Sequence, residues 1–140
     1  MKISIGADHR GYHLKQELIS KLTGYAWVDR GTTSIERTDY PLFARHVCKD
    51  LTDGAVEFGV LICGSGIGMS VAANRARKIY AALCWNEEIT KIARSHDGAN
   101  ILVLPSDFIS TDLALRLVEV FVSTSFLGER YQQRLSMIDS

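Results

Sequence analysis

The chain has 140 residues, a length that predicts one folded domain, residues 1–140, with a substantial buried core. Hydrophobic residues make up 46% of the sequence and charged residues 23%, which excludes a disordered or a membrane-embedded chain. Sixteen basic residues balance sixteen acidic ones, so the net charge is zero. This balance excludes a broad surface for nucleic acid or an anionic membrane, and any anion site must be local.

The cysteines and the apolar runs indicate the compartment. Cys48, Cys63 and Cys84 are odd in number and widely spaced, which fits neither a disulfide framework nor a zinc site. The apolar stretch at the N-terminus is too short for a signal peptide, and no window approaches the roughly 20 apolar residues of a membrane span. We therefore expect a protein of the reducing cytoplasm.

The first part of the chain alternates short apolar runs with stretches of helical periodicity. Residues 3–6 form the first predicted strand, and leucines recur every four residues in a helix predicted over 12–23, which ends at Gly24. A second strand is predicted over 26–29. After a polar loop, apolar residues fall on one face of a helix over 43–51.

The second part continues the alternation. Residues 58–63 read as a strand buried on both faces, because the run is apolar without interruption, and the glycine-rich turn 64–68 opens the next helix. The remaining predicted elements are a strand over 79–84, a helix that begins at the N-cap Asn86 and ends before Gly98, a strand over 101–104, and helices over 113–121 and 131–138.

Strands that alternate with helices predict a parallel sheet covered by helices on both faces, that is, a doubly wound α/β fold. Five such strands commonly have the order 2-1-3-4-5. In that order the carboxyl ends of the first and third strands flank the crevice where ligands bind. Asp8 and His9, after the first strand, are thus predicted to lie beside residues 63–68, after the third.

The segment 63–68 is the most informative motif of the sequence. Gly64, Gly66 and Gly68 follow a strand at alternate positions, so successive N–H groups can point at an anion, whereas a lone glycine would indicate only a tight turn. The spacing does not fit the dinucleotide fingerprint or the P-loop. A cysteine-phosphatase loop would need arginine where this chain has Met69. The motif therefore predicts a site for a small anion or a developing oxyanion.

Cys63 lies where this strand meets the start of a helix. Helix N-termini favour the thiolate form of a cysteine, so a thiol at this point can act as a base or a nucleophile. The alternative is a buried structural cysteine, which is the interpretation we favour for Cys48 and Cys84. The flanking glycine loop favours a functional role for Cys63.

Three further side chains are candidates for chemistry. His96 precedes the turn that leads to the fifth strand and can transfer protons near neutral pH, or it can simply cap its helix. Arg130 and Arg134 are spaced i, i+4, so they lie on one helical face. They can clamp a phosphate between them or form an ordinary solvated pair.

Taken together, these motifs resemble the type B ribose-5-phosphate isomerases and their relatives that act on galactose 6-phosphate and allose 6-phosphate. The resemblance covers nearly the whole chain. It implies a Rossmann-like enzyme that needs no metal and no cofactor, and that forms homodimers or larger assemblies with active sites at the subunit interface. The matching segments are, in order, Gly6-Ala7-Asp8-His9, Gly31-Thr32, Arg37-Thr38-Asp39-Tyr40-Pro41, Ile62-Cys63-Gly64-Ser65-Gly66-Ile67-Gly68, Ala72-Ala73-Asn74 and Gln132-Gln133-Arg134.

The resemblance also implies the reaction and the roles of residues. Ribose 5-phosphate and ribulose 5-phosphate would interconvert through an enediolate, with Cys63 moving the proton between C2 and C1. Some members use a glutamate instead, at the position of Met69. His96 would assist opening of the furanose ring. The predicted substrate-binding residues are Asp8, His9, Tyr40, Gly64, Ser65, Gly66, Ile67, Gly68, Asp97, Arg130 and Arg134.

Three positions depart from the family pattern. This chain has Asp97 where members usually have Asn, and Tyr131 where they usually have His. It has Asp107 where members usually have an Arg that the partner subunit lends as a phosphate contact. An aspartate in place of a cation near a phosphate removes attraction. The preferred sugar is therefore open between ribose 5-phosphate and a six-carbon sugar phosphate, and a non-catalytic sugar-phosphate-binding subunit is a further alternative.

Overall fold

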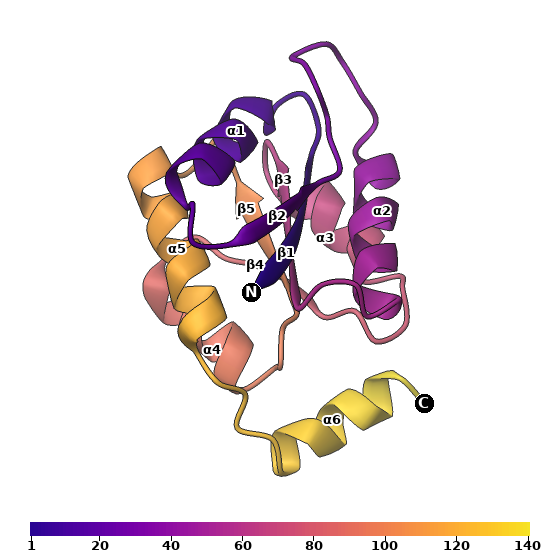
Figure 1. Cartoon of the computed structure of the whole chain (residues 1–140). Coiled ribbons are helices and arrows are strands. Elements are labelled where there is room, and N and C mark those ends of the chain that lie inside the picture. The colour runs from indigo at the N-terminus through magenta and orange to yellow at the C-terminus, as the bar shows by residue number, and fades with distance from the viewer.

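The computed structural model describes all 140 residues as a parallel sheet between helices (Figure 1). The strands are β1 (Lys2–Ala7), β2 (Ala26–Asp29), β3 (Phe58–Cys63), β4 (Ala81–Leu83) and β5 (Ile101–Pro105). The helices are α1 (Tyr12–Lys21), α2 (Tyr40–Thr52), α3 (Ile67–Ala73), α4 (Glu87–Ser95), α5 (Thr111–Ser123) and α6 (Arg130–Ile138). Every strand pair is parallel, so the predicted α/β fold with a five-stranded parallel sheet is confirmed.

Local sequence signals explain where the helices begin. Asn86 caps α4 as predicted, because its side-chain oxygen accepts the N–H of Ile89 at 2.9 Å. Pro41 lies in the first turn of α2, where the missing N–H costs no helical hydrogen bond. That helix begins at Tyr40, three residues before the predicted start.

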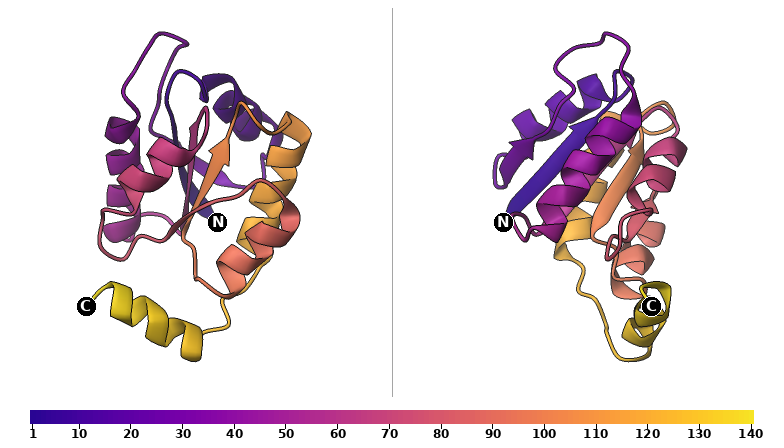
Figure 2. Two further views of the ribbon diagram at one scale, coloured as in Figure 1. Left: turned by 180° about the vertical axis from the view of Figure 1, so that it is seen from behind. Right: turned by 90° about the vertical axis from the view of Figure 1, so that its right-hand side faces the viewer.

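Helices cover both faces of the sheet (Figure 2), and an apolar cluster lies on each face. One face packs against α1, α4 and α5, and the leucines of α1 that recur every four residues lie in this cluster. The other face packs against α2 and α3, and it holds Cys48 and Cys63. β3 and β5 contribute side chains to both clusters, as expected for strands buried on both faces.

The predicted order of the last two strands is wrong. The observed order is β2-β1-β3-β5-β4, with β5 beside β3 and β4 at the edge. All five residues of β5 are buried, whereas β4 has only three residues, each half-buried, instead of the six predicted. A fully apolar strand gains most from neighbours on both sides, so it occupies the interior of the sheet. As a result, Pro105 pairs with Cys63, and the loop after β5 lies beside the end of β3.

Helix α6 lies apart from the rest of the chain, beyond the amino ends of the strands (Figures 1 and 2). Its one buried side chain, Leu135, lines a hollow together with Tyr80 and Ala99, which precede β4 and β5. Most of α6 is exposed. None of the helices combines the length and apolar character that crossing a bilayer requires.

Candidate active site

A cleft of about 310 Å³ lies at the carboxyl ends of β1, β3 and β5. It brings together residues from four separate parts of the chain. Six of the residues singled out from the sequence line it: Asp8, Tyr40, Cys63, Gly64, Ser65 and Gly68. The other lining residues are Arg10, Asp107 and Phe108.

Cys63, the last residue of β3, lies at the floor of this cleft with 5% of its surface exposed. The turn that follows leaves the N–H groups of Gly64, Ser65 and Gly66 without an acceptor in the chain. Gly66 makes this turn possible, because its φ of +74° is strained for any other residue and a Cβ atom there would collide with Leu83. The cleft thus combines a thiol with adjacent free N–H donors, which is an arrangement suited to an oxyanion.

The carboxylate of Asp8 is buried and holds the turn between β1 and α1 in place. Its Oδ1 atom accepts the N–H groups of Arg10 at 3.0 Å and of Gly11 at 3.2 Å. The N–H of Asp8 donates to the carbonyl oxygen of Ile62 in β3, which ties this turn to the strand that carries Cys63. The second carboxylate oxygen, Oδ2, has no hydrogen-bond partner in the chain.

His9 and Tyr40 are positioned by the loop that joins β2 to α2. The Nδ1 atom of His9 accepts the N–H of Thr38 at 3.2 Å, so in the neutral imidazole the proton lies on Nε2. His9 flanks Asp8 but does not line the cleft. The ring of Tyr40 lies over Gly68, where a Cβ atom would come within 2.6 Å of it. Gly66 and Ile67 also fall outside the lining residues.

Four other predicted residues lie at the opposite end of the sheet, around α6. His96 follows α4 and stacks on the ring of Tyr131, with ring centroids 4.7 Å apart and planes 6° apart. The guanidinium groups of Arg130 and Arg134 lie 5.0 Å and 5.6 Å from the centroid of the same ring. Asp97 lines the hollow under Leu135. The structure gathers these residues with one another but does not bring them to Cys63 of the same chain.

Three residues that line the cleft were not predicted from the sequence: Arg10, Asp107 and Phe108. Position 107 entered the sequence analysis only as a departure from the family pattern, and the structure shows that Asp107 lines the cleft of its own chain. The cause is the strand order, since β5 pairs with β3 and carries its following loop to Cys63. Arg10 directly follows Asp8 and His9 in the sequence, and this adjacency was the signal that could have found it.

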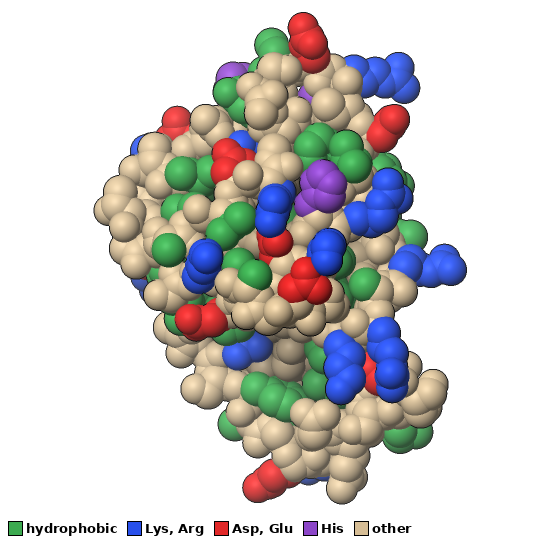
Figure 3. Space-filling model, turned by 45° about the vertical axis from the view of Figure 1, so that its right-hand side comes forward, with side chains coloured by type: hydrophobic (Ala, Val, Ile, Leu, Met, Phe, Trp, Pro, Cys, Tyr) green, Lys and Arg blue, Asp and Glu red, His purple; other side chains and the backbone are tan.

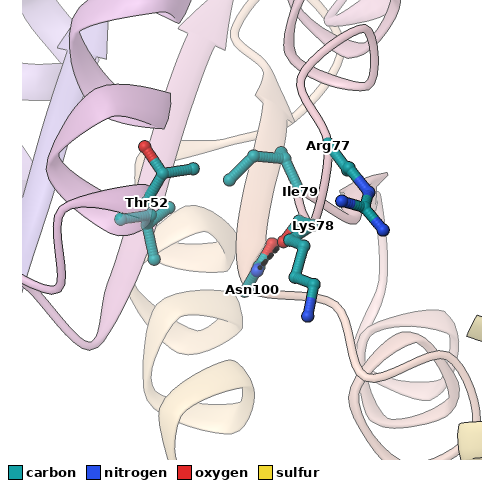
Figure 4. Close-up of a pocket in the computed structure, with 6 residues that line it drawn as sticks. Thr52, Arg77, Lys78, Ile79 and Asn100 are labelled. Atoms are coloured by element: carbon teal, nitrogen blue, oxygen red, sulfur yellow. Dashed lines mark hydrogen bonds between the residues drawn. The ribbon is translucent and has the colours of Figure 1, made fainter. Parts of the chain in front are cut away.

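A second hollow, of about 400 Å³, lies near the amino ends of β4 and β5, between Thr52 of α2 and the segment before β4 (Figure 4). In this view Ile79 points toward Thr52, whereas Arg77 extends away from it. Its lining contains no cysteine, histidine or carboxylate that could transfer a proton. On the face drawn in Figure 3, basic and acidic side chains are interspersed and form no continuous basic surface.

Cys48 and Cys84 differ from Cys63 in their surroundings. Burial raises the pKa of each of these two thiols to about 11, and neither lines the cleft. At pH 8 a group with this pKa is only about 0.1% ionised. We therefore expect iodoacetamide at pH 8 to modify Cys63 in the folded protein and to spare the other two. Peptide mass mapping checks this, and comparable labelling of Cys84 before unfolding would contradict it.

The comparisons with known proteins agree with this geometry. Residues 3–138 match the model of the Ribose/Galactose Isomerase family. Ribose-5-phosphate isomerase B of Escherichia coli (strain K12) is 38% identical over 139 residues, which cover 98% of this chain and 93% of that protein. A putative sugar phosphate isomerase of Rickettsia conorii is 39% identical over 138 residues, which cover 97% of this chain and 96% of that protein.

Solved structures give the same result. A ribose 5-phosphate isomerase of Thermotoga maritima superposes with a TM-score of 0.97 at 44% identity, over 99% of this chain and 97% of that one. Ribose-5-phosphate isomerase B of Mycoplasma genitalium, solved with bound ribulose 5-phosphate, superposes with a TM-score of 0.91 at 35% identity, over 98% and 93% of the two chains. The resemblance inferred from the motifs is thereby confirmed, and the chain belongs to the Ribose/Galactose Isomerase family.

Proposed function

We propose that this chain is an aldose–ketose isomerase that interconverts ribose 5-phosphate and ribulose 5-phosphate, a reaction of the pentose phosphate pathway, and that residues 1–140 act as one catalytic domain. The observation that carries the proposal is a thiol in a cleft at the carboxyl edge of the sheet, followed directly by a turn in which the N–H groups of Gly64, Ser65 and Gly66 have no acceptor in the chain. The named activity of the Escherichia coli relative and the ligand in the Mycoplasma genitalium structure support the choice of substrate.

Three free cysteines favour a cytoplasmic location.

Proton transfer through an enediolate accounts for each bond change. The Cys63 thiolate takes the proton from C2, the C–H electron pair forms the C1–C2 double bond, and the carbonyl electrons move to O1. The N–H groups of Gly64, Ser65 and Gly66 stabilise the charge on oxygen, and each such donor is commonly worth about 3 kcal/mol in the transition state. The thiol then returns the proton to C1, where the electron pair of the C1–C2 double bond forms the new C–H bond, and the electrons on O2 form the C2 carbonyl. A proton also passes from O2 to O1, which Asp8 or the Ser65 hydroxyl can carry.

The charge of the cleft supports a homodimer or homotetramer whose active site spans two subunits. The charged groups that line the cleft are the carboxylates of Asp8 and Asp107 and the guanidinium of Arg10, so its net charge is −1. A phosphate monoester carries a charge of about −1.5 to −2 at neutral pH and needs further cations. A second copy can supply Arg130 and Arg134, because its α6 lies at the opposite end of the sheet.

Exposed apolar side chains near both regions favour this assembly. Ile67 and Phe108 lie exposed near the cleft, and Met137 and Ile138 lie exposed on α6. Large exposed apolar side chains that cluster in this way are typical of protein interfaces. In the proposed assembly, His96 and Asp97 of the second copy face the cleft together with the two arginines.

A panel of aldose phosphates tests the proposed function. The purified protein is assayed in D₂O with ribose 5-phosphate, allose 6-phosphate and galactose 6-phosphate, and deuterium at C1 of the ketose is followed by NMR. We expect the highest kcat/KM with ribose 5-phosphate. Preference for a six-carbon substrate would shift the assignment to that alternative, which the carboxylate of Asp107 favours. If no substrate shows turnover or exchange at C2, the protein is a binding subunit and not an isomerase.

The proposed ring-opening role of His96 predicts a selective defect. His96→Asn should lower kcat/KM for ribose 5-phosphate, which is mostly a furanose, by about tenfold or more, because general acid–base assistance is lost. Erythrose 4-phosphate cannot close a furanose ring, so its isomerisation should fall by less than threefold. The reverse reaction cannot serve as the comparison, because the equilibrium constant fixes the ratio of forward to reverse kcat/KM. Equal losses on both aldoses would contradict the role.

A further inference from the structure

Arg10 and Asp107 form an ion pair inside the candidate active site. Arg10 comes from the turn after β1 and Asp107 from the loop after β5, and both line the cleft that holds Cys63. The Nε atom of Arg10 donates to Oδ2 of Asp107 at 3.0 Å, and Nη2 donates to the same oxygen. The side chains are 59% and 38% exposed, so the pair lies at the rim of the cleft.

The pair is built onto the same backbone that carries the thiol. A Cβ atom on Gly64 would come within 2.7 Å of both Arg10 Nε and Asp107 Oδ2, so the two side chains lie directly against the residue after Cys63. The N–H of Asp107 donates to the carbonyl oxygen of Gly64 at 3.0 Å. The hydroxyl of Ser106 donates to the carbonyl oxygen of Arg10 at 3.1 Å. Both partners are therefore anchored to the loops of the cleft.

Most of the guanidinium remains available to a ligand. A guanidinium has five N–H donors, and Asp107 accepts two of those of Arg10. The other three have no acceptor in the chain, and Arg10 is the only cation that lines the cleft. Exposed ion pairs of this kind contribute little to stability, so folding alone does not account for the arrangement. A planar fork with free donors suits a phosphate.

We propose that Arg10 binds the phosphate group of the substrate, with Asp107 as the positioning residue that holds its guanidinium against Gly64. This inference rests on the proposed function for its choice of ligand. The thiol lies at the buried floor of the cleft and the guanidinium at its exposed rim. A sugar phosphate with C2 at Cys63 extends its phosphate toward the rim, where Arg10 supplies charge from the same chain.

Binding of ribitol 5-phosphate, which cannot isomerise, tests the inference by calorimetry, with ribitol as the uncharged comparison. Arg10→Gln should lower the affinity for ribitol 5-phosphate at least about tenfold and leave the affinity for ribitol unchanged. Asp107→Asn keeps an oxygen acceptor for the guanidinium and removes a negative charge, so it should not lower the affinity for ribitol 5-phosphate. Arg116→Gln is a matched control, because Arg116 forms a similarly exposed ion pair with Glu87 at 3.0 Å.

The two variants of the pair separate a binding role from a structural one. Both remove the charge attraction between the two side chains, so a role that lies only in the ion pair predicts equal losses of affinity for Arg10→Gln and Asp107→Asn, and that result would overturn the inference. An unchanged affinity in Arg10→Gln would overturn it as well. Turnover of ribose 5-phosphate by the unmodified protein is measured in parallel. Arg10-dependent binding without turnover would refute the proposed function and leave the phosphate contact standing.

Discussion

Cys63→Ala is expected to lower the turnover of ribose 5-phosphate by about 10⁴-fold, the upper range for loss of a general base. The methyl group cannot accept the C2 proton, and no other cysteine or histidine lines the cleft to replace it. The affinity for ribitol 5-phosphate should stay within about threefold, because the free N–H groups of the loop and the ion pair at the rim are retained. Steady-state kinetics and calorimetry on the same preparation measure both quantities.

Cys84→Ala provides the matched control for this variant. Cys84 is fully buried and belongs to the apolar cluster on the other face of the sheet. Its replacement leaves a small cavity and should lower the melting temperature, with kcat unchanged. If Cys63→Ala kept full activity, the thiol would not be the base, and the isomerase mechanism given above would be wrong. Loss of activity in both variants would point to damage of the fold instead.

The fold could largely be predicted because its signals are local. Unbroken apolar runs marked the strands, and cap residues such as Asn86 marked helix starts. Strand order is not a local property, and the default order placed β4 and β5 the wrong way round. The sequence did contain a clue, because Ile101–Pro105 is apolar without interruption, whereas Ala81 and Ala82 carry little side chain to bury. The more apolar run belongs in the interior of the sheet.

Predicting the candidate site was limited by the same non-local step. Asp8 and Cys63 could be placed in one cleft because their strands adjoin in the predicted order as well as in the observed one. Asp107 could not, because its position depends on β5 lying beside β3. His96 and the arginines of α6 raise a different difficulty. They lie at the far end of the sheet from the cleft of their own chain. No property of a single sequence says whether these residues of a second copy lie in the cleft of the first.

Subunit complementation is expected to reveal whether two copies build each active site. Cys63→Ala and the double variant Arg130→Ala, Arg134→Ala should each be nearly inactive alone, since one lacks the base and the other the phosphate clamp. In a mixed dimer, one site combines the intact Cys63 of one subunit with the intact arginines of the other. Random exchange of equal amounts makes half of the dimers mixed, so the mixture should recover about one quarter of the unmodified activity.

The control for this experiment pairs two variants that affect the same cleft. Asp8 and Cys63 line one cleft of one chain, so a mixture of Asp8→Ala with Cys63→Ala has no intact site in any dimer and should stay inactive. Native mass spectrometry verifies that subunits have exchanged in both mixtures. If exchange is complete and the arginine variant still fails to complement Cys63→Ala, the two arginines do not serve the cleft of a second copy. Arg10 would then be the only arginine left to bind the phosphate.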